Sequence, residues 1–292
     1  MTIPTKSLSN NFSIPVFGLG TWQMGGRAER DLTNNDQADI QAIQNAVQAG
    51  ITHIDTAEAY ASGYSEKLVR KAISDFDRSK LFLVSKVTRT NQSYKQIKQS
   101  LHNSLSRLGT NYLDLYLLHA PSFDTAIEET MKAMDEFVAS GLIKNIGVSN
   151  FTVKQMQRAQ KATKNKIVVN QVHYNLSVRE VEDKGVLSYC QTHDVILMAW
   201  RPLEKGDVLT VGKGILNKLS KKYQKTPAQV AINWLISQKN VVTLSKMRDQ
   251  DHLQENLGSV DWKMSPEDIE YLRKEFPDQQ VVSSAVPLEE WK

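Results

Sequence analysis

The chain has 292 residues, of which 40% are hydrophobic and 23% charged, and its net charge at pH 7 is +4. This composition is typical of a soluble globular protein with one large core. The small charge, without a basic stripe interleaved with aromatic residues, argues against a nucleic-acid partner. No apolar run is long enough to span a bilayer, and residues 1–11 lack the apolar core of a signal peptide. With a lone cysteine, Cys190, these features predict a cytoplasmic protein without an intramolecular disulfide.

The first predicted element is a β-hairpin. Residues 6–8 and 13–16 are expected as two short strands, and Asn10 and Asn11 between them tolerate the positive φ of a tight turn. A hairpin placed before the rest of the fold is expected to have a structural role, as a plug.

Eight strand-like apolar runs follow along the chain. Their ends are separated by roughly 30 residues, which is the length of one strand plus one return helix. The runs cover residues 15–20, 52–55, 80–86, 112–119, 142–149, 167–171, 195–200 and 241–245. This repeat predicts a single α/β domain over residues 1–292, a (β/α)8 TIM barrel whose floor the hairpin plugs.

Helical patterns alternate with these runs. Helices are expected to begin at Asp36 and near residue 65, and others to cover residues 97–108 and 124–140; Gly50, Gly109 and Gly141 end three of them. Residues 172–194 contain more chain than one helix needs, and residues 204–237 predict an extra loop before a helix near residues 228–236. Thr226-Pro227 is expected to cap that helix. Ser265-Pro266 is expected to cap an extra C-terminal helix, followed by a tail across the barrel mouth.

Four polar residues are expected to meet at one rim of the barrel. Asp55, Lys86 and His119 each end a strand-like run, and Tyr60 follows the second run closely. Catalytic groups of such barrels lie at the C-terminal ends of the strands. A lysine ammonium next to a phenol favours the phenolate and lowers the phenol pKa from about 10.

These four groups are suited to proton donation. Asp55 can hold Lys86 by an ion pair, Tyr60 can give a proton to a developing alkoxide, and His119 can orient a carbonyl. No residue is placed as an activated nucleophile, because Cys190 lies in a predicted helix. Reduction of a carbonyl needs an external hydride, so a nicotinamide cofactor is implied.

Several segments carry a resemblance to a known family. They are Gly18-Leu19-Gly20-Thr21-Trp22, His53-Ile54-Asp55-Thr56-Ala57-Glu58-Ala59-Tyr60, Val84-Ser85-Lys86, Leu117-Leu118-His119, Gly147-Val148-Ser149-Asn150-Phe151 and Asn170-Gln171-Val172. In this order they resemble the aldo-keto reductase superfamily, and with the eighth run the resemblance covers nearly the whole barrel. It implies an NADPH-dependent oxidoreductase that reduces aldehydes or ketones to alcohols.

The resemblance also implies residue roles. Tyr60 would be the general acid, Asp55 and Lys86 its tuning pair, and His119 the carbonyl orienter. Ser149, Asn150 and Gln171 would bind the nicotinamide carboxamide, Trp200 would stack on the ring, and Leu203 would lie along the pyrophosphate. The full set of implied cofactor contacts is Thr21, Trp22, Asp55, Ser149, Asn150, Gln171, Trp200, Leu203, Lys246, Arg248, His252, Glu255 and Asn256.

The sequence departs from the family pattern after the eighth run. Lys246, Glu255 and Asn256 match, but Met247 replaces a hydroxyl donor to the cofactor 2′-phosphate. His252 replaces an arginine that would stack on adenine and pair with that phosphate. Arg248 is expected to compensate for the lost charge. NADPH is therefore the expected cofactor, and NADH is the alternative.

The substrate is expected to be a small carbonyl compound. Trp22, Tyr60, His119 and Phe123 are the predicted substrate contacts, and the aromatic walls suit aromatic or aliphatic aldehydes more than charged sugars. The loops over the barrel mouth determine the physiological substrate, because strand ends set the chemistry of a barrel and loops shape its pocket. The oligomeric state is not encoded in these patterns, and a monomer is the default.

Two other functions remain open from the sequence. A barrel hydrolase would use His53, Asp55, Lys86 and His119 as metal ligands, but His53 lies a layer below the rim and no His-x-His pair follows the first run. No metal is therefore expected. The second alternative is a regulatory or sensor subunit that binds the cofactor with little turnover.

Overall fold

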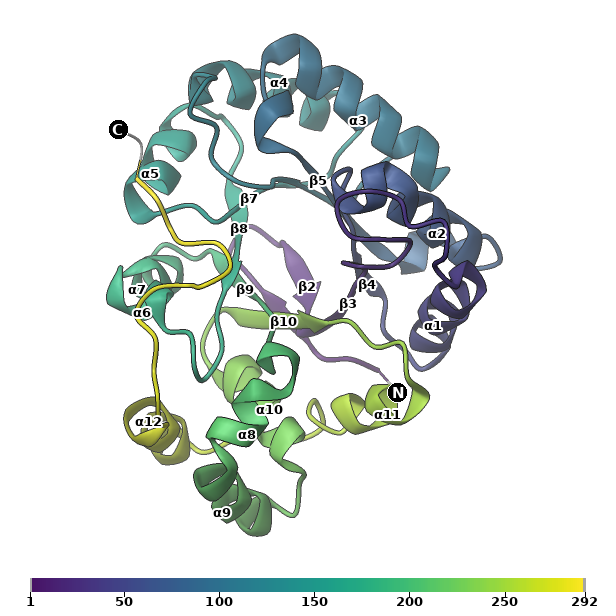
Figure 1. The fold of residues 1–292 in the computed structure, drawn as a ribbon. Helices are drawn as coiled ribbons and strands as arrows, with labels where there is room; N and C mark the ends of the chain where they lie inside the picture. Colours follow the sequence, from purple (N-terminus) through teal and green to yellow (C-terminus); the bar gives the residue numbers. More distant parts are fainter. Residues whose placement is uncertain (1, 291–292) are drawn as a thin grey trace.

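The computed structural model describes residues 2–290, and its centre is a closed barrel of eight parallel strands (Figure 1). The strands pair in the order β10-β3-β4-β5-β6-β7-β8-β9. Their bounds are β3 (Phe17–Gly20), β4 (His53–Asp55), β5 (Phe82–Val87), β6 (Leu115–Leu118), β7 (Ile146–Ser149), β8 (Ile167–His173), β9 (Ile196–Trp200) and β10 (Val241–Ser245). Each strand lies within or overlaps one of the eight predicted runs, so the predicted barrel is confirmed.

Helices surround the barrel and return the chain from each strand to the next (Figure 1). They are α1 (Asp36–Gln48), α2 (Tyr64–Ile73), α3 (Tyr94–Leu108), α4 (Ile127–Ala139), α5 (Val153–Lys161), α6 (Glu180–Asp183), α7 (Val186–Thr192), α8 (Asp207–Val211), α9 (Lys213–Tyr223), α10 (Pro227–Ser237), α11 (Gln250–Leu257) and α12 (Pro266–Glu275). Within residues 2–290, none of the helices combines the length and apolarity needed to cross a membrane.

The segment between β9 and α10 differs from the sequence prediction. An extra loop was expected there, but residues 207–211 and 213–223 form the helices α8 and α9. Leu216 and Leu219 are buried at helical spacing, and α9 packs against α10 and α8. The pattern was masked because Gly206, Gly212 and Gly214 interrupt a lysine-rich stretch, and glycines of this kind usually indicate loops.

The predicted helix starts are confirmed at two proline-led N-termini. Thr226 accepts a hydrogen bond from the Gln229 backbone, and Gln229 returns one, which makes a capping box at the start of α10. Ser265 caps α12 through the Asp268 N–H. Proline at the first helical position is tolerated because that N–H has no helical partner.

The predicted N-terminal hairpin is also confirmed. Strands β1 (Thr5–Ser7) and β2 (Ser13–Pro15) are antiparallel and lie across the middle of the barrel in Figure 1. Leu8, Phe12 and Ile14 pack in one apolar cluster with inward-facing residues of the barrel strands. With the hairpin closing one end, the opposite end, where the strands terminate in polar residues, is the one left for a binding site.

Candidate active site

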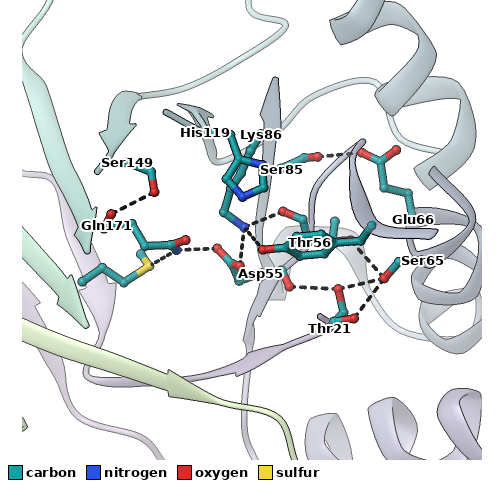
Figure 2. Close-up of polar contacts among 12 residues, drawn as sticks. Thr21, Asp55, Thr56, Ser65, Glu66, Ser85, Lys86, His119, Ser149 and Gln171 are labelled. Carbon is teal, nitrogen blue, oxygen red and sulfur yellow. Dashed lines mark hydrogen bonds and ion pairs between the residues drawn. The ribbon is translucent and has the colours of Figure 1, made fainter. Parts of the chain in front are cut away.

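Three strands and one short turn bring the four predicted catalytic residues together. Asp55 is the last residue of β4, Lys86 lies near the end of β5, and His119 directly follows β6. Tyr60 begins a 3-10 turn over residues 60–63 after β4. Side chains alternate along a strand, so Lys86 points into the barrel where the neighbouring strand presents Asp55. Figure 2 shows Lys86 reaching toward Asp55 and Thr56.

Lys86 is fully buried, and all three of its N–H donors have partners. Its Nζ lies 2.5 Å from Asp55 Oδ1, 2.8 Å from the Thr56 carbonyl oxygen and 3.2 Å from the Tyr60 hydroxyl. The other carboxylate oxygen of Asp55 accepts from Gln171 Nε2 at 2.8 Å. The ammonium is therefore held at one position, next to the phenol.

The electrostatics of the phenol differ from the prediction. Burial raises the pKa of Tyr60, and although the Lys86 ammonium lowers it, burial outweighs that contribution. The expectation of a lowered pKa is thus wrong in its net direction. For Lys86, burial lowers the pKa, but the Asp55 carboxylate and Tyr60 raise it above its ordinary value. At neutral pH the pair therefore consists of a protonated phenol and a charged amine.

His119 contributes a neutral imidazole beside the phenol. Burial lowers its pKa to about 3, and the Lys86 charge lowers it in the same direction. The His119 and Tyr60 rings have centroids 5.6 Å apart, and the Trp22 and Tyr60 rings have centroids 5.0 Å apart. A neutral imidazole has one N–H, so His119 can donate to a carbonyl oxygen that also faces Tyr60.

A cavity of about 830 Å³ connects this group to the far end of the barrel mouth. Its walls include most of the residues predicted for the site, which come from seven of the eight strand ends or the segments after them. Those residues are Trp22, Asp55, Tyr60, His119, Ser149, Asn150, Gln171, Trp200, Leu203, Lys246, His252, Glu255 and Asn256. The cavity therefore runs from Asp55, Tyr60 and His119 to Lys246 at the predicted phosphate site.

Besides Lys86, which is fully buried, three predicted site residues do not line this cavity. Thr21 is buried and donates to the Asp55 carbonyl oxygen at 3.1 Å, so it supports the strand end. Phe123 is 44% exposed and lies under the Arg89 guanidinium. Arg248 pairs with buried Asp39 at 2.5 Å. Its expected role as a substitute phosphate ligand gains no support from this position.

Other residues line the cavity without having been predicted. They are Gln23, Ala28, Arg201, Lys205, Leu209, Ala285 and Val286 among others. Gln23, Arg201 and Lys205 directly follow or lie near recognised motif residues, so proximity in sequence was the available signal. Ala285 and Val286 belong to the C-terminal tail, which reaches the barrel mouth as expected. Their side chains have no polar group that would have identified them in the sequence.

The ends of β7 and β8 hold an amide group with an open acceptor. Ser149 Oγ donates to the Gln171 carbonyl oxygen at 2.8 Å, and Asn150 Nδ2 donates to Ser149 Oγ at 3.0 Å. Asn150 has a φ of 60°, a conformation that asparagine tolerates better than most residues. Its buried Oδ1 has no hydrogen-bond partner among residues 2–290. A ligand amide N–H would satisfy that oxygen.

The far end of the cavity is positively charged. Lys246 donates to Gln23 Oε1 at 2.7 Å across the mouth. Burial lowers the pKa of Lys246, and the Arg248 guanidinium lowers it further. Met247, which stands where the family pattern has a hydroxyl donor, is 2% exposed and belongs to the core.

The described residues give no support to a metal centre. No three His, Cys, Asp or Glu side chains within residues 2–290 are placed to hold a metal ion. His53 is fully buried below Asp55, and burial lowers its pKa to about 4. Its ring packs edge-on against Phe82, as a structural histidine would.

Known proteins resemble this chain over nearly all of its length. A model described as "Aldo/keto reductase family" matches residues 16–275. Methylglyoxal reductase YeaE of Escherichia coli strain K12 is 36% identical, with 92% of this chain and 93% of that protein aligned. The thermostable aldo-keto reductase Tm1743, solved with the inhibitor epalrestat, has a TM-score of 0.88 at 39% identity, covering 93% of this chain and 99% of that one. An aldo-keto reductase from Klebsiella pneumoniae, solved with NADPH, has a TM-score of 0.84 at 33% identity, covering 96% and 97%. This chain is therefore a member of the aldo/keto reductase family.

Proposed function

We propose that this protein reduces small aldehydes and ketones to alcohols, with NADPH as the hydride donor and Tyr60 as the proton donor. The observation that carries the proposal is the position of Lys86 Nζ, 3.2 Å from the Tyr60 hydroxyl and 2.5 Å from Asp55 Oδ1. A fixed cation beside the phenol stabilises the phenolate that remains when the proton leaves. His119 donates its N–H to the carbonyl oxygen and aligns it with Tyr60.

The cavity fits a nicotinamide cofactor on the evidence of its own polar groups. The open Asn150 Oδ1 and the Ser149 hydroxyl suit a carboxamide, and Gln171 lies beside them in the cavity wall. Trp200 offers an aromatic surface for a planar ring, and Leu203 lines the path toward Lys246. Bound there, NADPH supplies a hydride to the carbonyl carbon. The protein's own task is to orient the carbonyl and deliver the proton.

NADPH is preferred to NADH because of the charge at the far end of the cavity. Lys246 and His252 line the cavity there. His252 lies on α11, and Glu255 and Asn256 follow it on that helix. An ammonium group favours the extra phosphate of NADPH. The Klebsiella pneumoniae relative was solved with NADPH, which agrees with this preference.

Small reactive aldehydes are the substrate class that the cavity suits best. Trp22, Trp200, Ala285 and Val286 give the cavity apolar walls, and the Trp22 ring packs against Tyr60. The Escherichia coli relative is named a methylglyoxal reductase, so methylglyoxal is the first substrate to test. A monomeric cytoplasmic enzyme with residues 1–292 in one domain stays a prediction; buried, unpaired Cys190 agrees with a reducing compartment.

The test is NADPH consumption by the purified protein with methylglyoxal and a panel of other aldehydes. Tyr60→Phe is expected to reduce kcat by about 10²- to 10⁴-fold, while NADPH still quenches tryptophan fluorescence with an unchanged Kd. Tyr64→Phe is the matched control, because its hydroxyl bonds Asp36 at 3.0 Å and Tyr64 lies outside the cavity wall.

Two results would change this conclusion. Near-normal turnover by Tyr60→Phe would remove Tyr60 from the role of acid. Tight NADPH binding with negligible turnover across the carbonyl panel would instead favour a regulatory or sensor subunit.

A further inference from the structure

The wall of the cavity at Trp200 is supported from behind by a histidine. His173 is the residue of β8 that pairs in register with Trp200 of β9. Their rings are stacked, with centroids 4.1 Å apart and planes within 9° of each other. Trp200 lines the cavity and His173 does not, and His173 is 3% exposed. His173 therefore covers the face of Trp200 that is turned away from the cavity.

The same imidazole holds the loop that follows β9. His173 Nε2 lies 2.5 Å from Glu204 Oε2, and Asn175 donates to that oxygen at 2.9 Å. Residues 201–206 all line the cavity. Arg201, Glu204 and Lys205 have positive φ angles of 56°, 44° and 58°, which residues with a β-carbon rarely adopt. Such a backbone persists only where its surroundings hold it. The Glu204 carboxylate holds this loop by its bonds to His173 and Asn175.

The other ring nitrogen connects to the C-terminal tail. Ser283 Oγ lies 2.8 Å from His173 Nδ1, and it accepts from the backbone N–H groups of Ala285 and Val286 at 3.2 and 3.0 Å. Because the oxygen accepts those two bonds, its own proton is free to go to Nδ1. Nε2 then carries the ring proton and donates it to Glu204. The hydrogen bonds thus run in one direction, from the tail through His173 to the loop.

We propose that His173 is a positioning residue that couples the two walls of the active site. Through Glu204 it fixes the loop of residues 201–206 and the Trp200 ring, which form the cofactor side of the cavity. Through Ser283 it fixes Ala285 and Val286, which form the carbonyl side. The inference rests on the proposed function for its division into cofactor and carbonyl sides, but the coupling itself is a property of the fold.

Three variants separate the parts of this coupling. His173→Phe keeps an aromatic ring against Trp200 and removes both hydrogen bonds. His173→Gln keeps a polar group and removes the ring. Ser283→Ala removes the bond to His173 together with the two bonds that Ala285 and Val286 donate to Ser283 Oγ, and leaves Glu204 bonded to His173. The tail remains tied by the Ser283 and Leu288 N–H groups to Glu180 at 3.0 Å. His193→Phe is the matched control, because His193 stacks on Tyr189 at 4.0 Å on α7, outside the cavity wall.

His173→Phe is expected to weaken NADPH binding, measured by tryptophan fluorescence, by about tenfold, and to raise the carbonyl KM by a similar factor. kcat at saturation is expected to fall much less, because no group at the reacting atoms is lost. His173→Gln is expected to weaken NADPH binding at least as much, because Trp200 loses its support. Ser283→Ala is expected to raise the carbonyl KM and leave NADPH binding unchanged, and His193→Phe to match wild type in both.

Amide hydrogen exchange tests the coupling without turnover. In His173→Phe, peptides that cover residues 201–211 and 283–288 are expected to exchange faster than in wild type, while the barrel strands keep their protection. Wild-type exchange in both peptides, with NADPH Kd and carbonyl KM unchanged, would overturn the proposal. So would a Ser283→Ala variant that loses NADPH affinity but keeps its carbonyl KM. Failure of the proposed function would appear separately, as normal turnover in Tyr60→Phe.

Discussion

Replacing Lys86 by methionine gives the sharpest test of how the catalytic group is held together. The side chain is fully buried and methionine has a similar volume, so packing changes little. Asp55, 2% exposed, would be left with the 2.8 Å bond from Gln171 as its remaining side-chain donor. Removing one partner of a buried ion pair costs about 3–5 kcal/mol, because the other charge stays buried without compensation. We expect Lys86→Met to lose that amount of unfolding free energy.

The loss originates in buried groups that are left without a partner. The Asp55 carboxylate stays buried, and the Thr56 carbonyl oxygen and the Tyr60 hydroxyl also lose the Lys86 donor. Leaving one buried partner unpaired costs more than replacing both partners by neutral groups.

Urea unfolding at pH 7, followed by circular dichroism, is the assay. Asp55→Asn/Lys86→Met removes both charges and should recover much of the loss, because no ion remains buried. Lys98→Met is the control, since the Lys98–Glu136 pair is 41% exposed on both sides, and no measurable change is expected. The reasoning fails if Lys86→Met is as stable as wild type at pH 7, or if the double variant is less stable than the single one.

Three further predictions concern single side chains. Burial holds the His119 pKa at about 3, so its NMR signals should not titrate between pH 8 and 5, and a midpoint near the usual value of about 6.5 would contradict this. Because the unfolded chain takes up that proton first, His119 lowers stability as pH falls below about 6.5. His252→Arg should tighten NADPH binding about tenfold and leave NADH binding unchanged by fluorescence titration; equal gains for both would place residue 252 away from the phosphate. Burial raises the pKa of Cys190 to about 12, so a thiol reagent should label it only in denaturant, and rapid labelling of the native protein would show that α7 opens.

The barrel could be predicted from the sequence because its signal repeats. Each strand run carries the same length and apolar character, and Gly109, for example, ends α3 in the left-handed conformation that its position suggested. The strand ends then fixed the meeting of Asp55, Lys86 and His119, because parallel strands of a barrel share one C-terminal rim. Local periodicity and topology are sufficient for this part of the site.

Features that depend on a single tertiary contact could not be predicted. Arg248 follows Lys246 in the sequence like a second phosphate ligand, but the buried Asp39 carboxylate of α1 takes its guanidinium. Helices α8 and α9 were missed because glycine and lysine hide the apolar positions that pack these helices against α10. His173 carried no motif, and its contacts reach residues 31 and 110 positions away in the chain. No local pattern records such pairings.

The raised pKa of Tyr60 agrees with its proposed role once the timing of the charge is considered. A donor must hold its proton in the resting site, and burial ensures this at neutral pH. The Lys86 ammonium acts most strongly when negative charge forms on the phenol oxygen 3.2 Å away, which happens only as the proton leaves. An interaction that strengthens toward the transition state accelerates the reaction, whereas one present equally at rest does not. Asp55 and the Thr56 carbonyl keep the ammonium in place, so little reorganisation is needed at that moment.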